Sequence, residues 1–337
     1  MAVRIGESTI QFTNKPSVIG YGSVVGKNEY EGPLSSEFDA HDLDSYFGEK
    51  TFEKAESRMQ KIALETALKK CGRNENDIDV IFAGDLLNQC VGSSFGLRST
   101  GISFAGIYGA CSTMALGMIM ASVFVDSGAA RCAAAVTSSH FCSAERQYRY
   151  PLEYGSVRPQ SAQWTVTGSG ASILSLAEAK PFIDKATIGK IVDLGVKDAN
   201  NMGAAMAPGA ADTLCSYFND TETAPKDYDR IFTGDLGKVG TKLLYTLTEQ
   251  NGYNIREKHD DCGLMIFDLL RQDVHSGGSG CGCSASVLNS YIYHKFESGA
   301  YKNILFMSTG ALLSPTSTMQ GESIPGISHL INIQIRH

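Results

Sequence analysis

Hydrophobic positions along the chain fall into short apolar runs that alternate with helical stretches. Four short apolar runs are typical of buried strands. They cover residues 17–26, 77–84, 131–140 and 164–176. Residues 51–71 instead place apolar side chains at three- and four-residue spacing, with Thr51 as a capping residue and Gly72 as a stop. Strands that alternate with helices predict an α/β fold with a largely parallel sheet.

No charged residue occurs between Arg98 and Asp126. The pattern predicts a tight turn and then a helix that starts near Ser112, is apolar all round and is therefore buried on every side. The stretch is long enough to cross a bilayer, but its glycines and serines favour a core helix. The N-terminus has no apolar secretory segment, so we expect neither a signal peptide nor a transmembrane segment.

Composition narrows the function classes. The chain has 337 residues, enough for two units of ordinary domain size, and 43% hydrophobic residues support a large core. A net charge of −7 argues against nucleic-acid binding, which needs a basic surface. The nine cysteines lack regular spacing, which indicates reduced thiols and no zinc or other metal site.

A repeat divides the chain. Residues 79–86 and 229–236 are identical at six of eight positions, 150 residues apart. The turn at 110–112 has a counterpart at 282–284, and the strand at 131–140 has one at 302–310. Three matches in the same order predict a duplication, with halves 1–178 and 179–337 whose central helices begin at a shared cleft.

Cys111 stands where the turn meets the apolar helix. The positive end of a helix dipole and free backbone N–H groups lower a thiol pKa and bind anions. A cysteine at that position is therefore a candidate nucleophile or ligand contact. The alternative is a buried small apolar residue at a packed turn.

These motifs resemble known families. Residues 109–117 are similar to the nucleophile loop of ketoacyl synthase III in the thiolase superfamily, and 280–287 to the loop that carries its catalytic asparagine. A closer resemblance, over essentially the whole chain, is to the stage V sporulation protein AD family, carried by residues 149–155, 162–168, 310–315 and 320–326. It implies a thiolase-like layered α/β fold of two duplicated halves, and a homodimer.

The resemblance also implies a function. The family is implicated in uptake and release of dipicolinic acid, pyridine-2,6-dicarboxylic acid, by bacterial spores. The implied partners are dipicolinic acid or its calcium chelate and the membrane proteins of the same stage V sporulation A operon. These membrane proteins would hold the protein peripherally at the spore inner membrane. No cofactor is implied beyond calcium carried by the chelate.

Catalysis is not expected, because the partners of the nucleophile differ. Gly234 or Asp235 stands where ketoacyl synthases have a histidine, and Cys281 where they have the asparagine. A carboxylate in the place of the histidine would repel a developing enolate. The alternative function is an acyl-thioester condensing enzyme or acyltransferase that uses Cys111.

Dipicolinate should need N–H donors, a cation and an apolar slot for its ring. The candidate ligand-binding residues are Cys111, Ser112, His140, Arg149, Gly234, Asp235, Cys281, Cys283 and Gly310. Two alternatives stay open: His140 as a hydrogen-bonded core histidine, and the arginines near residue 149 as a solvated loop. If the ligand arrives as a calcium chelate, Asp235 or Asp85 could approach the metal.

Overall fold

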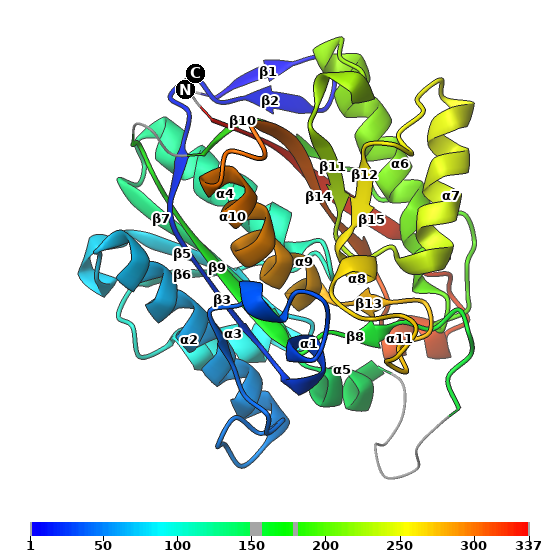
Figure 1. The fold of residues 1–337 in the computed structure, drawn as a ribbon, viewed down its shortest axis with the longest axis horizontal. Helices are drawn as coiled ribbons and strands as arrows, with labels where there is room; N and C mark the ends of the chain where they lie inside the picture. The colour runs from blue at the N-terminus through cyan, green and yellow to red at the C-terminus, as the bar shows by residue number, and fades with distance from the viewer. Residues whose placement is uncertain (1, 149–156, 178–180, 336–337) are drawn as a thin grey trace.

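The strands form two groups with the same internal order (Figure 1). The computed structural model describes residues 2–148, 157–177 and 181–335. The first group runs β3 (Ser17–Val25), β9 (Gly168–Ser175), β7 (Cys132–Ser139), β5 (Val80–Gly84), β6 (Ser103–Gly106). The second runs β10 (Phe182–Ile188), β15 (Gly326–Gln334), β14 (Asn303–Ala311), β11 (Arg230–Thr233), β12 (His259–Asp261). Strand by strand, the second half repeats the first.

The sheet is mixed, not largely parallel as the alternation of strands and helices predicts. β5 and β11 pair in parallel with both of their neighbours. β9 and β15 run antiparallel to both of theirs. A single pairing of Phe182 with Ser17 joins the groups, and the shorter strands lie outside this order: β1 (Val3–Ile5), β2 (Thr9–Gln11), β4 (Ala40–His41), β8 (Trp164–Thr165) and β13 (Gly278–Ser279).

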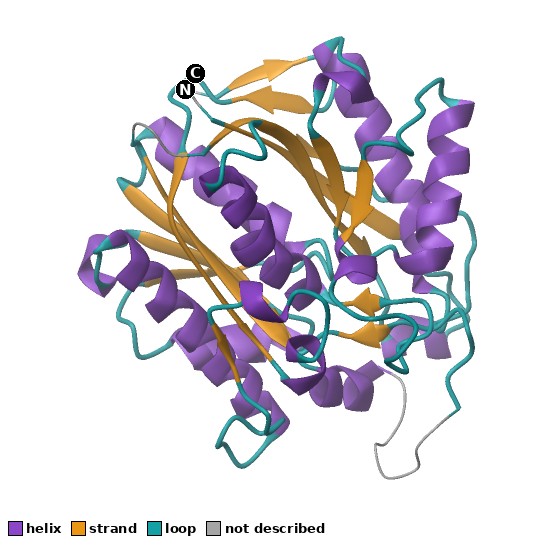
Figure 2. Ribbon diagram, in the orientation of Figure 1, coloured by secondary structure: helices purple, strands orange, loops and turns teal. Residues whose placement is uncertain are grey.

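Helices lie between and outside the two strand groups (Figure 2). The central layer holds α4 (Thr113–Ser127), α9 (Cys281–Val287) and α10 (Tyr293–Glu297). The outer helices are α2 (Phe52–Cys71) and α3 (Val91–Leu97) on the first half, α6 (Met202–Thr221) and α7 (Gly237–Gln250) on the second. The remaining helices are short, namely α1 (Lys27–Tyr30), α5 (Phe141–Tyr148), α8 (Cys262–Met265) and α11 (Pro315–Met319).

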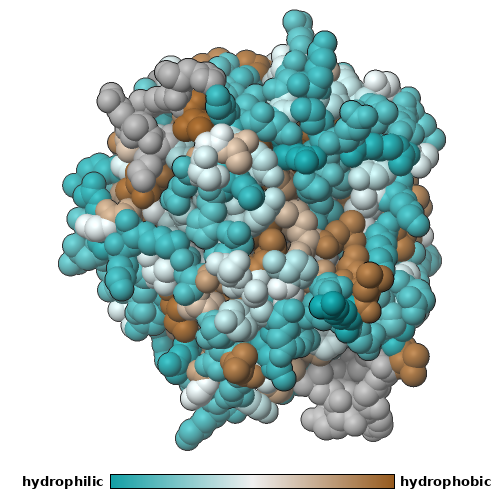
Figure 3. Space-filling view, in the orientation of Figure 1, coloured by the Kyte–Doolittle hydropathy of each residue, from teal (hydrophilic) through white to brown (hydrophobic). Residues whose placement is uncertain are grey.

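The apolar helix α4 is a core helix. It contacts β5 and β7 of the first half and β14 and β15 of the second, which bury most of its surface. The face that carries Leu116, Met120 and Val123 is only partly buried, so the prediction of burial on every side is wrong for that face. Its stretch 110–127 has the length and apolarity of a membrane span, yet 72% of it is buried inside the molecule. The face of the molecule in Figure 3 is mainly hydrophilic, with apolar side chains in small separate groups.

The first residue of each repeated segment, 79–86 and 229–236, makes the same kind of contact. The Asp79 carboxylate accepts the backbone N–H groups of Arg131 and Cys132, and so ties the start of β5 to β7. The Asp229 carboxylate accepts those of Lys302 and Asn303 between β11 and β14. The duplicated fold is therefore visible in single contacts. The expected boundary between 178 and 179 falls among residues outside the described ranges, and the domain limits stay a prediction.

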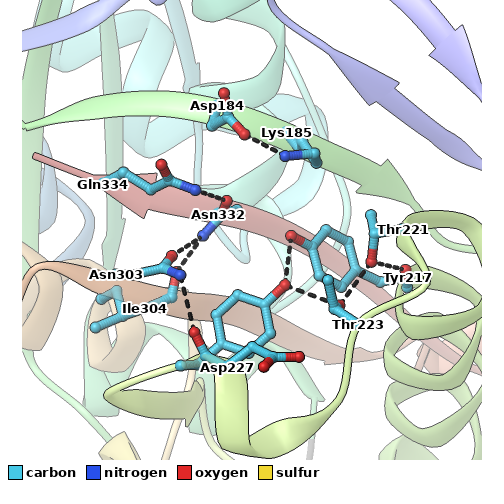
Figure 4. A network of polar contacts seen from close by, with 11 residues as sticks. Asp184, Lys185, Tyr217, Thr221, Thr223, Asp227, Asn303, Ile304, Asn332 and Gln334 are labelled. Atoms are coloured by element: carbon cyan, nitrogen blue, oxygen red, sulfur yellow. Dashed lines mark hydrogen bonds and ion pairs between the residues drawn. The ribbon is translucent and has the colours of Figure 1, made fainter. Parts of the chain in front are cut away.

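A polar network fixes the second strand group to the end of α6 (Figure 4). The Tyr228 hydroxyl donates to that of Tyr217 at 3.1 Å. The Asn303 amide donates to the main-chain oxygen of Asp227 at 3.0 Å, and Asn332 donates to the Asn303 side chain at 2.7 Å. Pairing these polar groups with one another lets them lie against the sheet without a desolvation penalty.

Candidate functional site

The turn before α4 holds Cys111 in one position. Ala110 has a left-handed backbone, with φ of 50°, and both the N–H and the hydroxyl of Ser112 donate to the Gly109 carbonyl at 3.0 and 2.6 Å. Gly310 packs directly on this turn, because a Cβ there would lie 2.6 Å from the Gly109 oxygen. Only glycine allows that approach, so Gly310 shapes the Cys111 turn from the second half.

Asp235 meets Cys111 at the centre of the fold. Its carboxylate accepts the Thr309 hydroxyl at 2.6 Å, the Gly280 N–H at 2.8 Å and the Ser279 hydroxyl at 3.2 Å. The Cys111 thiol lies next to this carboxylate, and the two groups shift one another's pKa. Burial raises the pKa of Asp235 to about 7, although these hydrogen bonds oppose the rise.

The thiol of Cys111 is protonated rather than activated. Burial raises its pKa well above the usual value, and the charge of the Asp235 carboxylate adds to the increase. The sequence pattern predicts the opposite, a pKa lowered by the start of the helix. Of the two alternatives for Cys111, the lowered pKa is therefore wrong and the buried residue at a packed turn is the better description, because the second half of the chain covers the thiol and brings a carboxylate to it.

The backbone donors expected to hold an anion are already occupied. The N–H of Ser112 donates to Gly109, and that of Thr113 to Ala110 at 3.3 Å. At the equivalent helix of the second half, α9 begins at Cys281, and the Cys283 N–H donates to the Gly280 carbonyl at 2.9 Å. The two helix starts therefore offer fewer free donors than the sequence suggests.

The two second-half cysteines lie in different surroundings. Cys281 is fully buried, packs with Cys111 in one apolar cluster, and donates its thiol to the Ser138 carbonyl at 2.9 Å. Cys283 lies in the main core cluster and does not line the cavity beside Cys111. Gly234 packs behind Asp235, where a Cβ would lie 3.1 Å from the Thr309 nitrogen.

A small, partly open cavity lies beside Cys111. Its volume is about 30 Å³, room for one or two water molecules. Apolar walls come from Leu86, Ala110, Ala144, Met202, Ala311 and Leu313. Hydroxyl groups come from Tyr108, Tyr148, Thr165 and Ser279. None of the described residues in its wall is cationic, and neither Asp235 nor Asp85 belongs to that wall.

Two tyrosines that face one another form part of this wall. The hydroxyls of Tyr108 and Tyr148 are 3.1 Å apart, and the Tyr148 hydroxyl also bonds the Leu86 carbonyl. No motif singles out Tyr108, although its place just before the Gly109–Cys111 turn is a usable signal. Tyr148 belongs to the aromatic and basic run that the sequence associates with the ligand.

His140 lies away from Cys111. Its Nδ1 accepts the Cys142 N–H at 3.1 Å and its Nε2 is 2.7 Å from the Ser45 carbonyl, which requires the proton on Nε2. Burial lowers its pKa, so the ring is neutral. The ring lines a separate cavity with Glu29 and does not point into the cavity beside Cys111, because strand β7 ends in a turn that directs it to Ser45. The core-histidine alternative describes it correctly.

Two further expectations have a different outcome. Arg149 lies outside the described residues, while Arg146 nearby is paired with Glu53. Among the described residues no group of three His, Cys, Asp or Glu side chains is placed to hold a metal ion. The Asp85 carboxylate accepts the N–H and hydroxyl of Ser93 at 2.8 and 2.6 Å, so it points toward α3 and away from Cys111.

Comparison of the sequence with known proteins identifies the family of this chain. Residues 6–334 match the family described as Stage V sporulation protein AD. The chain is 44% identical over 324 residues to the Stage V sporulation protein AD of Bacillus subtilis strain 168, covering 96% of each chain. This chain belongs to the stage V sporulation protein AD family. It is a sporulation protein with a thiolase-like fold.

The solved structures of similar shape are condensing enzymes. The 3-oxoacyl-[acyl-carrier-protein] synthase III of Aquifex aeolicus VF5 superposes with a TM-score of 0.56 at 13% identity, over 95% of this chain and 99% of that one. A single-residue variant of OleA from Xanthomonas campestris gives 0.61 at 14% identity, over 97% of this chain and 98% of that one. At such low identity the likeness establishes the thiolase-like fold alone.

Proposed function

We propose that this protein binds dipicolinic acid, or its one-to-one calcium chelate, beside Cys111 and catalyses no condensation. The observation that carries the proposal is the buried Asp235 carboxylate, held by Thr309, Gly280 and Ser279 next to Cys111, whose thiol pKa it raises further. Gly234 or Asp235 stands where the resemblance to ketoacyl synthases implies a histidine. The family's role in sporulation supports a spore metabolite as the ligand.

Condensation needs a thiolate and groups that stabilise negative charge on substrate. Cys111 keeps its proton, and the nearest ionisable group is an acid that would add negative charge. Cys281, at the implied asparagine position, donates its thiol proton to the Ser138 carbonyl and has no amide to donate. The alternative, an acyl-thioester enzyme, has the thiolase-like fold and Cys111 in its favour but lacks both partners.

The cavity wall favours a flat ligand of low net charge. Apolar side chains suit a pyridine ring, and the hydroxyl of Tyr108 can donate to a carboxylate oxygen. A bare dianion would lose its hydration on entering the cavity, and no cationic side chain among the described wall residues would compensate for that loss. The neutral calcium chelate avoids this penalty. We therefore propose that the chelate is the preferred form, and that the cavity widens to admit it.

The proposal extends to partners and location. We propose a homodimer, and peripheral attachment to the spore inner membrane through membrane proteins of the same operon. The outer strand β6 has one free edge among the described strands, and Phe104 on it and Phe95 nearby are 42% and 56% exposed. An exposed edge with apolar side chains favours association with another chain. The oligomeric state in solution tests the dimer.

The experiment compares wild type with Cys111→Ala, and with Cys283→Ala as a matched cysteine outside the cavity. Calorimetric titration with dipicolinate should give saturable binding in all three proteins, because no step needs the thiol. Incubation with an acyl-thioester should leave Cys111 unmodified by mass spectrometry. Acylated Cys111 together with no dipicolinate binding would replace the proposal with the enzyme alternative.

A further inference from the structure

Tyr108 and Tyr148 separate two spaces in the molecule. On one side lies the small cavity beside Cys111, of about 30 Å³, and on the other a larger groove of about 420 Å³. The groove is bounded by Leu87, Cys90, Leu312 and Pro315. Both spaces share the two tyrosines and Leu313 in their walls. The pair of hydroxyls therefore stands where the groove meets the cavity.

We propose that Tyr108 and Tyr148 are the specificity-determining residues of this site. Bonded to one another they close the passage, and a ligand reaches Cys111 by replacing their mutual bond with bonds to itself. The inference rests on the proposed ligand site and adds to it the route of entry and the basis of selection.

The hydrogen bonds indicate which tyrosine moves. The Tyr148 hydroxyl has a second partner, the Leu86 carbonyl, to which it donates its proton. Tyr108 must then donate to the Tyr148 oxygen, and this is the one hydrogen bond described for its hydroxyl. Tyr108 lies in the loop after β6 and is 47% exposed, so it can turn into the groove without breaking a helix or strand.

The same bonds explain selection between ligand classes. A carboxylate oxygen accepts a hydroxyl proton strongly, so a dicarboxylate compensates for the bond that it disrupts. The hydrocarbon part of an acyl thioester accepts no hydrogen bond, and its neutral thioester carbonyl accepts the Tyr108 proton less strongly than a carboxylate does. The closed pair therefore admits small planar carboxylates and discriminates against acyl thioesters, the substrates of condensing enzymes.

Cysteine labelling tests the passage without any ligand. The full chain is treated with iodoacetamide and the cysteines are quantified by mass spectrometry; Cys90 in the groove is the internal standard and buried Cys283 the negative control. Tyr108→Phe and Tyr148→Phe should raise the ratio of Cys111 to Cys90 labelling about fivefold, since each removes the mutual hydrogen bond. Tyr253→Phe, which loses a hydroxyl bonded to Asn219, should leave the ratio unchanged.

The outcomes separate this inference from the proposed function. An unchanged labelling ratio in both tyrosine variants overturns the role of the pair, even if dipicolinate binds wild type. A raised ratio supports it, even if dipicolinate does not bind and the proposed ligand is therefore wrong. If dipicolinate binds, Tyr108→Phe should weaken that binding about fivefold relative to Tyr253→Phe. Equal affinity in these two variants would overturn the selection step.

Discussion

Replacing Asp235 with asparagine should change how stability depends on pH. The Asp235 pKa is raised from 3.8 to about 7 in the folded protein. The folded state therefore binds a proton more tightly than the unfolded chain does, and the stability of wild type falls as pH rises from about 4 to 7. The whole loss is about 4 kcal/mol, of which about 2–3 kcal/mol falls between pH 5 and 8.

Asparagine has no such titration. Asp235→Asn loses acceptors for the Gly280 N–H or Ser279 hydroxyl and should be less stable than wild type at pH 5. The stability difference between this variant and wild type should change in favour of the variant by about 2–3 kcal/mol between pH 5 and pH 8. Glu29 and Glu56, buried acids with pKa raised to about 8, are present in both proteins, so their pH dependence cancels in the difference.

The assay is urea unfolding at pH 5, 6, 7 and 8, followed by fluorescence of Trp164, the single tryptophan. Labelling of Cys111 by iodoacetamide should also become faster in Asp235→Asn, because the carboxylate that raises the thiol pKa is gone. Asp85→Asn, the equivalent position of the repeat, is the control for that rate. Parallel pH–stability curves for wild type and Asp235→Asn would refute the reasoning.

Two further substitutions test the account. Gly310→Ala should lower the free energy of unfolding by about 1–3 kcal/mol, since its Cβ would lie 2.6 Å from the Gly109 oxygen; a change within about 0.5 kcal/mol in urea unfolding would contradict the contact. His140→Asn should cost about 1–2 kcal/mol by losing the bond to the Ser45 carbonyl, while dipicolinate affinity in calorimetry stays at the wild-type value. A large loss of dipicolinate affinity without a loss of stability would contradict this prediction and indicate that His140 contacts the ligand.

Local signals account for the elements that the sequence predicts well. The helix at Phe52–Cys71 has its Thr51 cap and its left-handed Gly72 stop in the expected places. The central helix begins at Thr113, one residue after the predicted Ser112 start. Apolar periodicity and capping act over a few residues, so they can be recognised without knowledge of the fold.

Contacts between distant segments are what the sequence does not show. Residues 79–86 and 229–236 are identical at six of eight positions, yet the Asp85 carboxylate bonds Ser93 in α3 while the Asp235 carboxylate bonds Thr309 next to Cys111. Their different roles depend on Ser93 in one half and on Thr309 in the other, which no local pattern reveals. The predicted direction of the Cys111 pKa shift is wrong for the same reason, since it depends on Asp235, which is distant in the sequence.

The candidate site was predictable in part. The resemblance brought together Cys111, Asp235 and Cys281, and the structure places these three residues side by side. Tyr108 was missed, because a tyrosine carries no motif of its own and its partner Tyr148 is 40 residues away. Cys283 was misplaced because α9 begins at Cys281, four residues before the position that the repeat pairs with Thr113, and the Cys283 side chain turns into the core.

One titration tests the central claim most directly. Wild-type protein is titrated calorimetrically with dipicolinate in calcium, with dipicolinate in chelator, and with benzene-1,3-dicarboxylate, which lacks the ring nitrogen that completes the chelate. We predict saturable binding of dipicolinate that is tightest with calcium, and weak or no binding of the benzene analogue. Absence of saturable dipicolinate binding in either condition would contradict the account, and equal affinity with and without calcium would contradict the proposal that the chelate is the preferred form.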